Sequence, residues 1–268
     1  IDNINFIFET QNKDLDISDL KFTYKKINFT SKKIELKNKD NFVNIEGEIS
    51  NKEVTLTKEL LKNIFNPLLK VDFKKLKFSS KNEFLLKIDD KFKISDYEIK
   101  SSLNLDELII KNDINLKSIF PNLQSEIKFK DHQTNIILKK DFFLINGNGD
   151  FLIQKNYDKA IYKIEKSKDK HLFNIKLNII DNQINFDFLN YNSDDNSDSS
   201  LELDGKFIKD KTLDLEKIKF ENGSDLININ NLKFTSDFKI SNIETAIFNF
   251  TDRQNKKNIF QINNNKGN

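Results

Sequence analysis

The chain has 268 residues, and 44 basic against 42 acidic side chains give it a formal net charge of +2. This balance argues against a dedicated nucleic-acid-binding protein, which concentrates basic residues on one face. The absence of Cys excludes disulfides, Cys-ligated zinc and thiol nucleophiles.

The first half of the chain shows the alternation of apolar and polar residues that is typical of β-strands. Leu20, Phe22 and Tyr24 alternate with Lys21 and Thr23. Successive side chains of a strand point to opposite faces, so this pattern predicts one apolar and one wet face. Short polar segments separate such strands and predict turns, namely residues 38–41, 89–91 and 146–150.

Two segments depart from this alternation and predict short helices. Residues 57–66 place their apolar side chains on one helical face and end before Pro67. Residues 114–120 are a second, turn-like piece that ends at Pro121. Because proline cannot continue a helix, both positions suit a helix end.

The second half returns to strand patterns. The apolar members of three of them are Ile175, Leu177 and Ile179; Ile184, Phe186 and Phe188; and Leu232 and Phe234. Together the patterns predict about 15 to 18 strands at the spacing of an antiparallel meander. The Asn-, Asp- and Ser-rich tract 190–200 has almost nothing to bury, so we expect a flexible loop there.

The chain is expected to be one elongated β segment, residues 1–268, of a larger protein. It begins with Ile1 and contains no Met, which favours an internal or processed piece. Its longest apolar runs are only a few residues, far short of the roughly 20 that a membrane-spanning helix needs. Any membrane anchor would therefore lie outside this segment.

No pattern of residues predicts a catalytic, cofactor-binding or metal site, and we expect a protein that is not an enzyme. His132 and His171 lie far apart, outside any metal-ligand spacing, and are interpreted as surface or strand-end residues. Gly147 and Gly149 form a G-x-G without a following helix, which indicates a hairpin rather than a nucleotide loop. No cofactor is predicted.

The 25 Phe residues require cover, because burying one such side chain stabilises by about 1.5–3 kcal/mol. The predicted fold class is all-β, a long antiparallel meander curled into an elongated groove or packed as a sandwich, with one or two short helices. A sandwich or a barrel would cover the apolar faces with protein, whereas a curled sheet could hold lipid.

The texture of the chain resembles the AsmA-like family of bacterial envelope proteins, over most of its length and without an invariant motif. The resemblance is carried by the short amphipathic strands and by residues 15–22, 43–49 and 102–108. It implies a long β-sheet trough with an apolar interior, implicated in moving phospholipid between membranes. It also implies a periplasmic location in the bacterial cell envelope, with an inner-membrane anchor in a part outside this segment.

The leading hypothesis is therefore a non-enzymatic apolar β-groove for phospholipid transfer or outer-membrane maintenance. Its partners would be phospholipid acyl chains and not nucleic acid, and the sequence predicts no oligomeric state. The candidate lining residues are Phe22, Phe29, Phe78, Phe186, Phe188 and Phe234. The alternative is a structural or adhesive β-sandwich surface protein, in which the same side chains form a closed core.

Overall fold

The computed structural model describes residues 1–39, 41–65, 72–113, 115–193, 197–208, 212–237 and 239–264, without the side chains of 62–65. The elements of the first half are β1 (Asp2–Gln11), β2 (Asp14–Tyr24), β3 (Ile27–Lys39), β4 (Phe42–Thr57), α1 (Lys58–Phe65), β5 (Phe73–Asp89), β6 (Ile94–Lys111) and β7 (Glu126–Lys139). Those of the second half are β8 (Phe142–Leu152), β9 (Asp158–Ser167), β10 (Lys170–Ile179), β11 (Asn185–Phe186), the 3-10 turn η1 (Asp187–Leu189), β12 (Tyr191–Asn192), β13 (Ser199–Ile208), β14 (Thr212–Asn222), β15 (Asp225–Phe234), β16 (Ile240–Asn242), β17 (Thr245–Thr251) and β18 (Lys257–Asn263).

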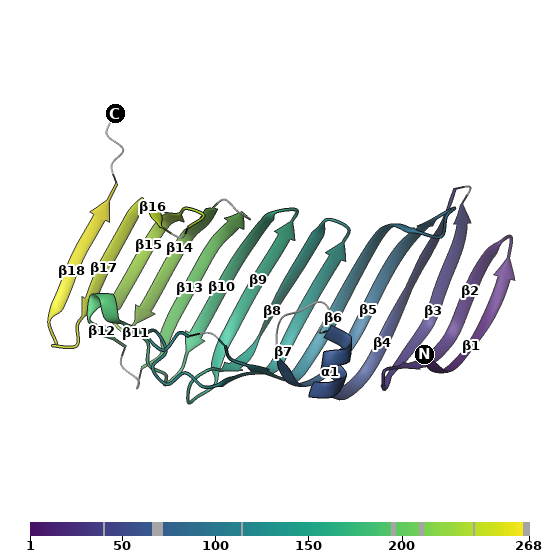
Figure 1. The fold of residues 1–268 in the computed structure, drawn as a ribbon, viewed down its shortest axis with the longest axis horizontal. Helices are drawn as coiled ribbons and strands as arrows, with labels where there is room; N and C mark the ends of the chain where they lie inside the picture. The colour runs from purple at the N-terminus through teal and green to yellow at the C-terminus, as the bar shows by residue number, and fades with distance from the viewer. Residues whose placement is uncertain are drawn as a thin grey trace. The chain divides into compact units, whose positions relative to one another are not determined.

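Sixteen strands form one antiparallel sheet in which almost every strand pairs with its neighbour in sequence (Figure 1). The order runs from β1 to β10 without interruption and continues through β13, β14, β15, β17 and β18, while β16 pairs with β15. The short strands β11 and β12 form a separate two-stranded sheet. The predicted all-β meander is confirmed, and the described strands contain no second large sheet that would make it a sandwich.

The chain packs as two compact units. Unit 1 comprises residues 1–109 and 130–145, and unit 2 comprises residues 110–129 and 146–268. That both units belong to a single segment of a larger protein stays a prediction.

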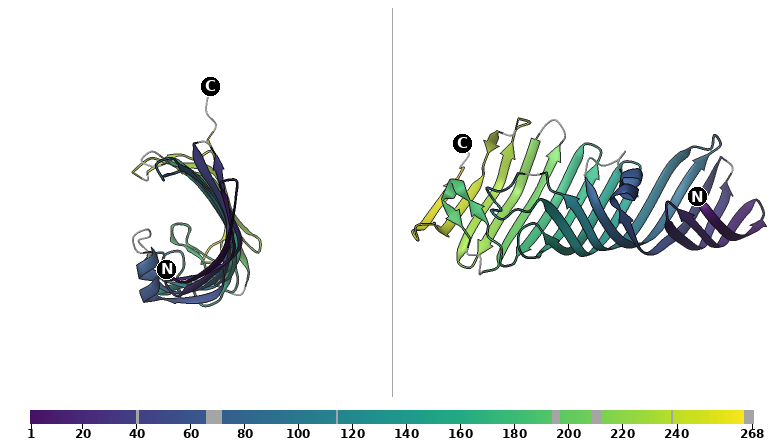
Figure 2. Two further views of the ribbon diagram at one scale, coloured as in Figure 1. Left: turned by 90° about the vertical axis from the view of Figure 1, so that its right-hand side faces the viewer. Right: turned by 60° about the horizontal axis from the view of Figure 1, so that its bottom comes forward.

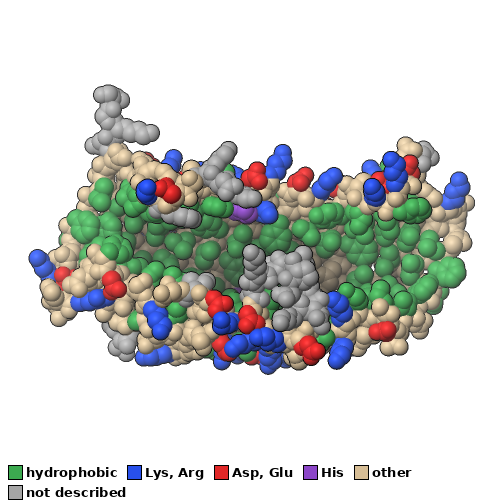
Figure 3. All heavy atoms as spheres, in the orientation of Figure 1, with side chains coloured by type: hydrophobic (Ala, Val, Ile, Leu, Met, Phe, Trp, Pro, Cys, Tyr) green, Lys and Arg blue, Asp and Glu red, His purple; other side chains and the backbone are tan. Residues whose placement is uncertain are grey.

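The register of unit 1 gathers apolar residues on one face. Leu15 of β2 lies opposite Leu36 of β3, which lies opposite Ile45 of β4, which in turn lies opposite Leu86 of β5. Residues directly opposite each other in an antiparallel pair point to the same face, so they make one apolar row across four strands. The strands of this unit are curved, and the apolar side chains line the inside of the curve (Figures 2 and 3).

One end of this face is covered by α1, which contacts β4 and β5 and confirms the predicted helix over its described residues. Leu56 and Leu76 lie opposite each other beneath it, and their side chains are buried, as is Leu61 of the helix itself. The helix thus uses its apolar side to close a small part of the sheet.

The second predicted helix, residues 114–120, is wrong. Ile114 lies outside the described residues, and the remaining residues do not form a helix. Residues 115–120 form a hydrogen-bonded turn in which the backbone N–H of Phe120 donates to the carbonyl of Leu116 at 2.8 Å. A single closed turn does not propagate here because Pro121 follows directly. Phe120 and Leu116 pack instead on the core of unit 2.

Two turn and strand predictions are also corrected. Residues 146–150 do not form a hairpin but lie inside β8, because the chain already reverses at residues 140–141. Neither Gly147 nor Gly149 adopts the positive φ that an Asn-Gly turn requires. The segment from Ile184 to Phe188 is not a regular strand, because only Asn185 and Phe186 pair before the 3-10 turn begins.

The tract 190–200 is not simply a flexible loop. Tyr191 is fully buried, Ser193 and Ser199 are buried as well, and β13 begins at Ser199. Residues 194–196 lie outside the described residues. The polar composition of the tract predicted a loop, but the burial of Tyr191 packs the beginning of the tract against the core.

Gly205 provides a test of the strand register in unit 2. It lies at the bulge between β13 and β14, where a Cβ atom would stand 2.7 Å from the carbonyl oxygen of Asp214 and 2.6 Å from Cζ of Phe173. Gly205→Ala should therefore destabilise the protein by about 1–3 kcal/mol in urea unfolding, as overpacking does. Gly223→Asn is the control, because the turn at Gly223 has open space and a φ of +56° that Asn tolerates. An unfolding midpoint of Gly205→Ala equal to that of the wild type would contradict this packing.

Candidate functional site

The open part of the apolar face of unit 1 is the first candidate site, and we call it the unit 1 apolar face. It comprises the row described above and two further sets on the same strands. Ile17, Ile34, Gly47 and Phe84 form a second row, and Phe22 lies opposite Phe29 with ring centroids 5.2 Å apart. A small residue at Gly47 lets Ile34 approach its backbone closely, since a Cβ there would meet Ile34 Cγ1 at 2.9 Å.

Most side chains of this face are only half-buried. Phe22, Phe29, Ile45 and Leu86 all keep part of their surface exposed, whereas Ile34 is buried. Half-buried apolar side chains in adjacent rows form a continuous apolar surface on the concave side (Figure 3). A surface of this kind lowers its free energy by taking an apolar ligand.

The opposite face of the same strands is charged. Lys33 Nζ lies 3.0 Å from Asp16 Oδ2 and 2.5 Å from Glu35 Oε1, and Lys37 Nζ lies 2.6 Å from both Glu35 Oε2 and Glu46 Oε1. Hydrogen bonds from Lys33 and then Lys37 lower the pKa of Glu35 to about 2. Exposed pairs add little stability, but they keep this face in water and so fix which side of the sheet is apolar.

Unit 2 also has an apolar face, but much of it is covered by protein. The cover consists of residues 115–124 and of the hairpin 184–193, which we call the flap. Beneath them lies a core of fully or nearly fully buried side chains, Ile179, Phe220, Ile227, Ala246, Phe248 and Phe250. Side chains of unit 2 therefore cover its own apolar face, whereas the described residues of unit 1 leave most of the unit 1 apolar face half-exposed.

A buried polar network fixes the chain where it enters the flap. The backbone N–H of Ile180 and Nδ2 of Asn182 donate to Asp158 Oδ1 at 2.8 and 3.0 Å. Gln154 Nε2 donates to the carbonyl of Gln183 at 2.9 Å. Asp158, Asn182 and Gln154 are almost inaccessible to solvent, and burial raises the pKa of Asp158 to about 6. Sequence reasoning missed this network because buried Asn, Gln and Asp look like surface residues in a polar-rich chain.

The structure does not bring the six predicted lining residues to one place. Phe22, Phe29 and Phe78 belong to the apolar face of unit 1, where Phe78 lies opposite Val54. In unit 2, Phe234 lies opposite Leu213 and is half-buried. In the flap, Phe186 packs against Phe220, whereas Phe188 is 77% exposed at the tip. Their contact with lipid stays a prediction.

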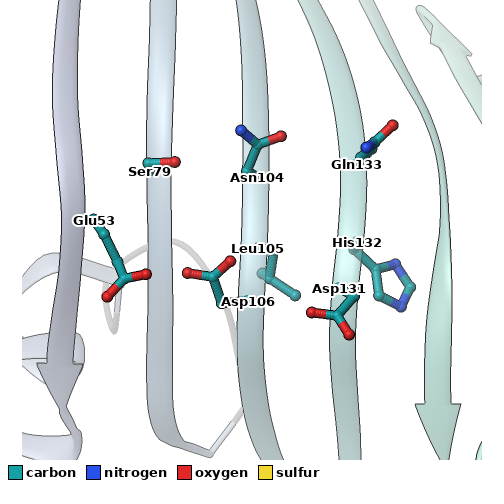
Figure 4. A pocket seen from close by; sticks show the side chains of 8 residues that line it. All are labelled: Glu53, Ser79, Asn104, Leu105, Asp106, Asp131, His132 and Gln133. Atoms are coloured by element: carbon teal, nitrogen blue, oxygen red, sulfur yellow. The ribbon is translucent and has the colours of Figure 1, made fainter.

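A pocket of about 320 Å³ opens in unit 1 among residues of β4–β7. The carboxylates of Glu53 and Asp106 point toward each other, Asp131 lies beyond them, and His132 points away (Figure 4). A hydrogen bond to Glu53 raises the pKa of Asp106, while a hydrogen bond from Lys77 lowers that of Glu53. The two carboxyl groups thus shift each other's pKa beside a lysine.

The pocket does not supply a metal site or a nucleophile. No group of three or more His, Asp or Glu side chains among the described residues could hold a metal ion. His132 is buried within β7, so its interpretation as a surface or strand-end residue is wrong, whereas His171 is half-buried near the start of β10 and stacks on Phe207. The apolar faces therefore remain the stronger candidates for function.

Comparison with known proteins returned no match to a family model, to a curated protein or to a solved structure. Among the described residues, no helix combines the length and the apolar character needed to span a membrane.

Tyr191 and Phe188, one buried and one exposed aromatic residue of the flap, provide a matched pair for a stability test. Tyr191 is fully buried against Phe220 and Phe250, at centroid distances of 5.8 and 5.6 Å. Tyr191→Ala should lower the free energy of unfolding by about 3–5 kcal/mol, the range for large aromatic-to-alanine changes in a core. Phe188→Ala, at an exposed position of the same flap, should change it by less than about 0.5 kcal/mol. Equal effects in urea unfolding would show that the flap does not pack as described.

Asp158 should make stability depend on pH. Its pKa is raised from 3.8 to about 6, so between about pH 4 and 6 the folded protein holds a proton that the unfolded chain releases. The free energy of unfolding should fall as the pH rises through this window, by up to about 3 kcal/mol. Asp158→Asn keeps an acceptor for Ile180 and Asn182 but carries no charge, so it should flatten this slope. Unfolding curves of both proteins at pH 4 and pH 7 measure the difference, and parallel slopes would contradict it.

Proposed function

We propose that the unit 1 apolar face binds phospholipid acyl chains, as part of a non-enzymatic envelope protein for phospholipid transfer or outer-membrane maintenance. The observation that carries the proposal is a continuous apolar surface that stays half-exposed while the opposite side of the same strands is charged. The resemblance of the sequence to AsmA-like proteins points in the same direction. The proposal includes a periplasmic location and an inner-membrane anchor outside this segment.

The mechanism is passive. Each methylene group taken from water gains about 0.8 kcal/mol, so an acyl chain lying along the apolar rows stabilises itself and the side chains that it covers. The Lys, Asp and Glu side chains at the margins of the concave face leave the head group in water (Figure 3). Rows of similar Leu, Ile and Phe side chains offer similar contacts at successive positions, which favours sliding over fixed binding.

Adjacent residues on opposite faces of β3 provide the test. Phe29 lies on the unit 1 apolar face, and Thr30 is exposed on the charged side, opposite Lys21. Phe29→Asp should reduce the loading of co-purified phospholipid, detected by mass spectrometry, by about tenfold, because it removes one large apolar contact and introduces a charge. Thr30→Asp adds the same charge on the wet face and should leave loading unchanged.

Crosslinking distinguishes this proposal from a closed structural module. A phospholipid with a photoreactive acyl chain should label wild-type protein on β2–β5 peptides. Wild-type protein that carries no phospholipid after gentle extraction, and that the probe does not label, would overturn the proposal. The structural or adhesive surface protein would then be the better interpretation.

A further inference from the structure

The flap does not belong to the large sheet. Its strands β11 and β12 pair only with each other and belong to no other sheet. The hairpin is closed at its base by Ser193, whose backbone N–H donates to the carbonyl of Ile184 and whose hydroxyl accepts from the N–H of Ile184, both at 2.8 Å. The flap is thus a short hairpin with the 3-10 turn at its tip. One backbone hydrogen bond, from the N–H of Asn185 to the carbonyl of Ile119 at 2.8 Å, joins it to residues 115–124.

The inner side of the flap is aromatic. Phe186 stacks on Tyr191 at 6.0 Å, and both rings contact Phe220 edge to face, at 5.2 and 5.8 Å. Phe220, at 1% exposure, belongs to the apolar face of unit 2, opposite Leu201 and Ile227. The rings of the flap therefore cover apolar side chains in unit 2. Comparable side chains of the unit 1 apolar face stay half-exposed among the described residues.

Arg253, the single arginine of the chain, donates hydrogen bonds to the outer end of the flap. Its backbone N–H donates to the carbonyl of Asn190 at 2.9 Å. Its guanidinium donates to Asn192 Oδ1 and Asp187 Oδ1, both at 2.5 Å, and to the carbonyl of Tyr191 at 3.5 Å. A planar guanidinium can reach several acceptors at once, which a lysine cannot do.

The hydrogen bonds of Arg253 are numerous, but its ion pair with Asp187 contributes little to stability. The side chains of Arg253 and Asp187 are 34% and 60% exposed, and water competes with ion pairs at such exposure. The entry to the flap is different, because Asn182 is 2% exposed in the buried network that also holds Asp158. The polar contacts at the entry to the hairpin are therefore buried, whereas those at its outer end are exposed to water.

We propose that the flap is a displaceable cover over a second acyl-chain-binding surface, formed by Phe220, Ile227, Phe248 and Phe250, and that Arg253 is its latch. The class of ligand rests on the proposed function of the unit 1 apolar face; the cover itself rests on the contacts of unit 2. Without a ligand, opening would expose several aromatic rings to water, so the flap stays closed. An acyl chain that takes the place of Phe186 and Tyr191 restores those contacts and makes opening possible.

The absence of Cys and Trp from the chain allows a clean experiment on the full protein. The double variant Asn190→Cys with Arg253→Cys places two thiols where the backbones already form a hydrogen bond. Oxidation locks the flap shut, and reduction leaves it without its latch. Phe186→Trp in the same protein reports contact with lipid, through quenching by phosphatidylcholine vesicles whose acyl chains carry bromine.

Quenching should be about two- to fivefold greater in the reduced than in the oxidised protein, the range expected when an exposed ion pair is lost. Equal quenching in the two states, with the disulfide confirmed by mass spectrometry, would overturn the proposal. A protein with Phe29→Trp as its only reporter separates the two proposals. Quenching at position 29 without quenching at 186 overturns the flap alone, and the reverse overturns the unit 1 site alone.

Hydrogen exchange provides a second measurement that needs no tryptophan. In Arg253→Ala, brominated phosphatidylcholine vesicles should increase amide exchange in residues 184–193 while leaving β13 and β14 protected. Arg253→Lys keeps the charge but not the fork, and it should fall between the alanine variant and the wild type. Exchange in the flap that the vesicles leave unchanged in Arg253→Ala would overturn the cover.

Discussion

The register of the antiparallel meander is the constraint on which the other features of this protein depend. Opposed residues share a face, so the row from Leu15 to Leu86 stays apolar only while each turn keeps the strands in step. A slip by one residue would turn the Lys33, Glu35 and Lys37 side into the concave face. The bulges, such as that between Asp204 and Gly205, change the register without breaking the apolar rows beyond them.

The sequence predicted the strands that follow from alternation of apolar and polar residues. It missed the features that depend on packing between distant segments. The alternation at residues 20–24 and 175–179 predicted β2 and β10, and the apolar side of α1 was visible beside Pro67. The same alternation was misleading at residues 184–188, because nothing local distinguishes an inward-folded hairpin from a strand. The burial of Tyr191 and the network of Asp158 depend on partners dozens of residues away, which no window of sequence contains.

The two units differ in how their apolar rows are covered. Both present rows of Leu, Ile and Phe on one side of the sheet, and neither can leave such rows in water without cost. In unit 2, Phe120, Ile184 and Tyr191 cover the rows from within the chain, while in unit 1 the cover supplied by the described residues lies near Leu61. Under the proposed function, the flap covers in unit 2 the kind of surface on which an acyl chain would lie in unit 1.

The order of the strands also bears on how unit 2 folds. Contacts between neighbouring strands join residues close in sequence, and such contacts form early because little chain entropy is lost in closing them. The clasp of the flap is an exception, since Arg253 is separated by 61 residues from Asn192 and by 66 from Asp187. The strands from β13 to β17 lie between these partners in the chain and must be in place before the clasp can form. From this separation we expect closure of the flap to be a late step of folding, and a chain arrested before it would expose Phe220 to other apolar surfaces.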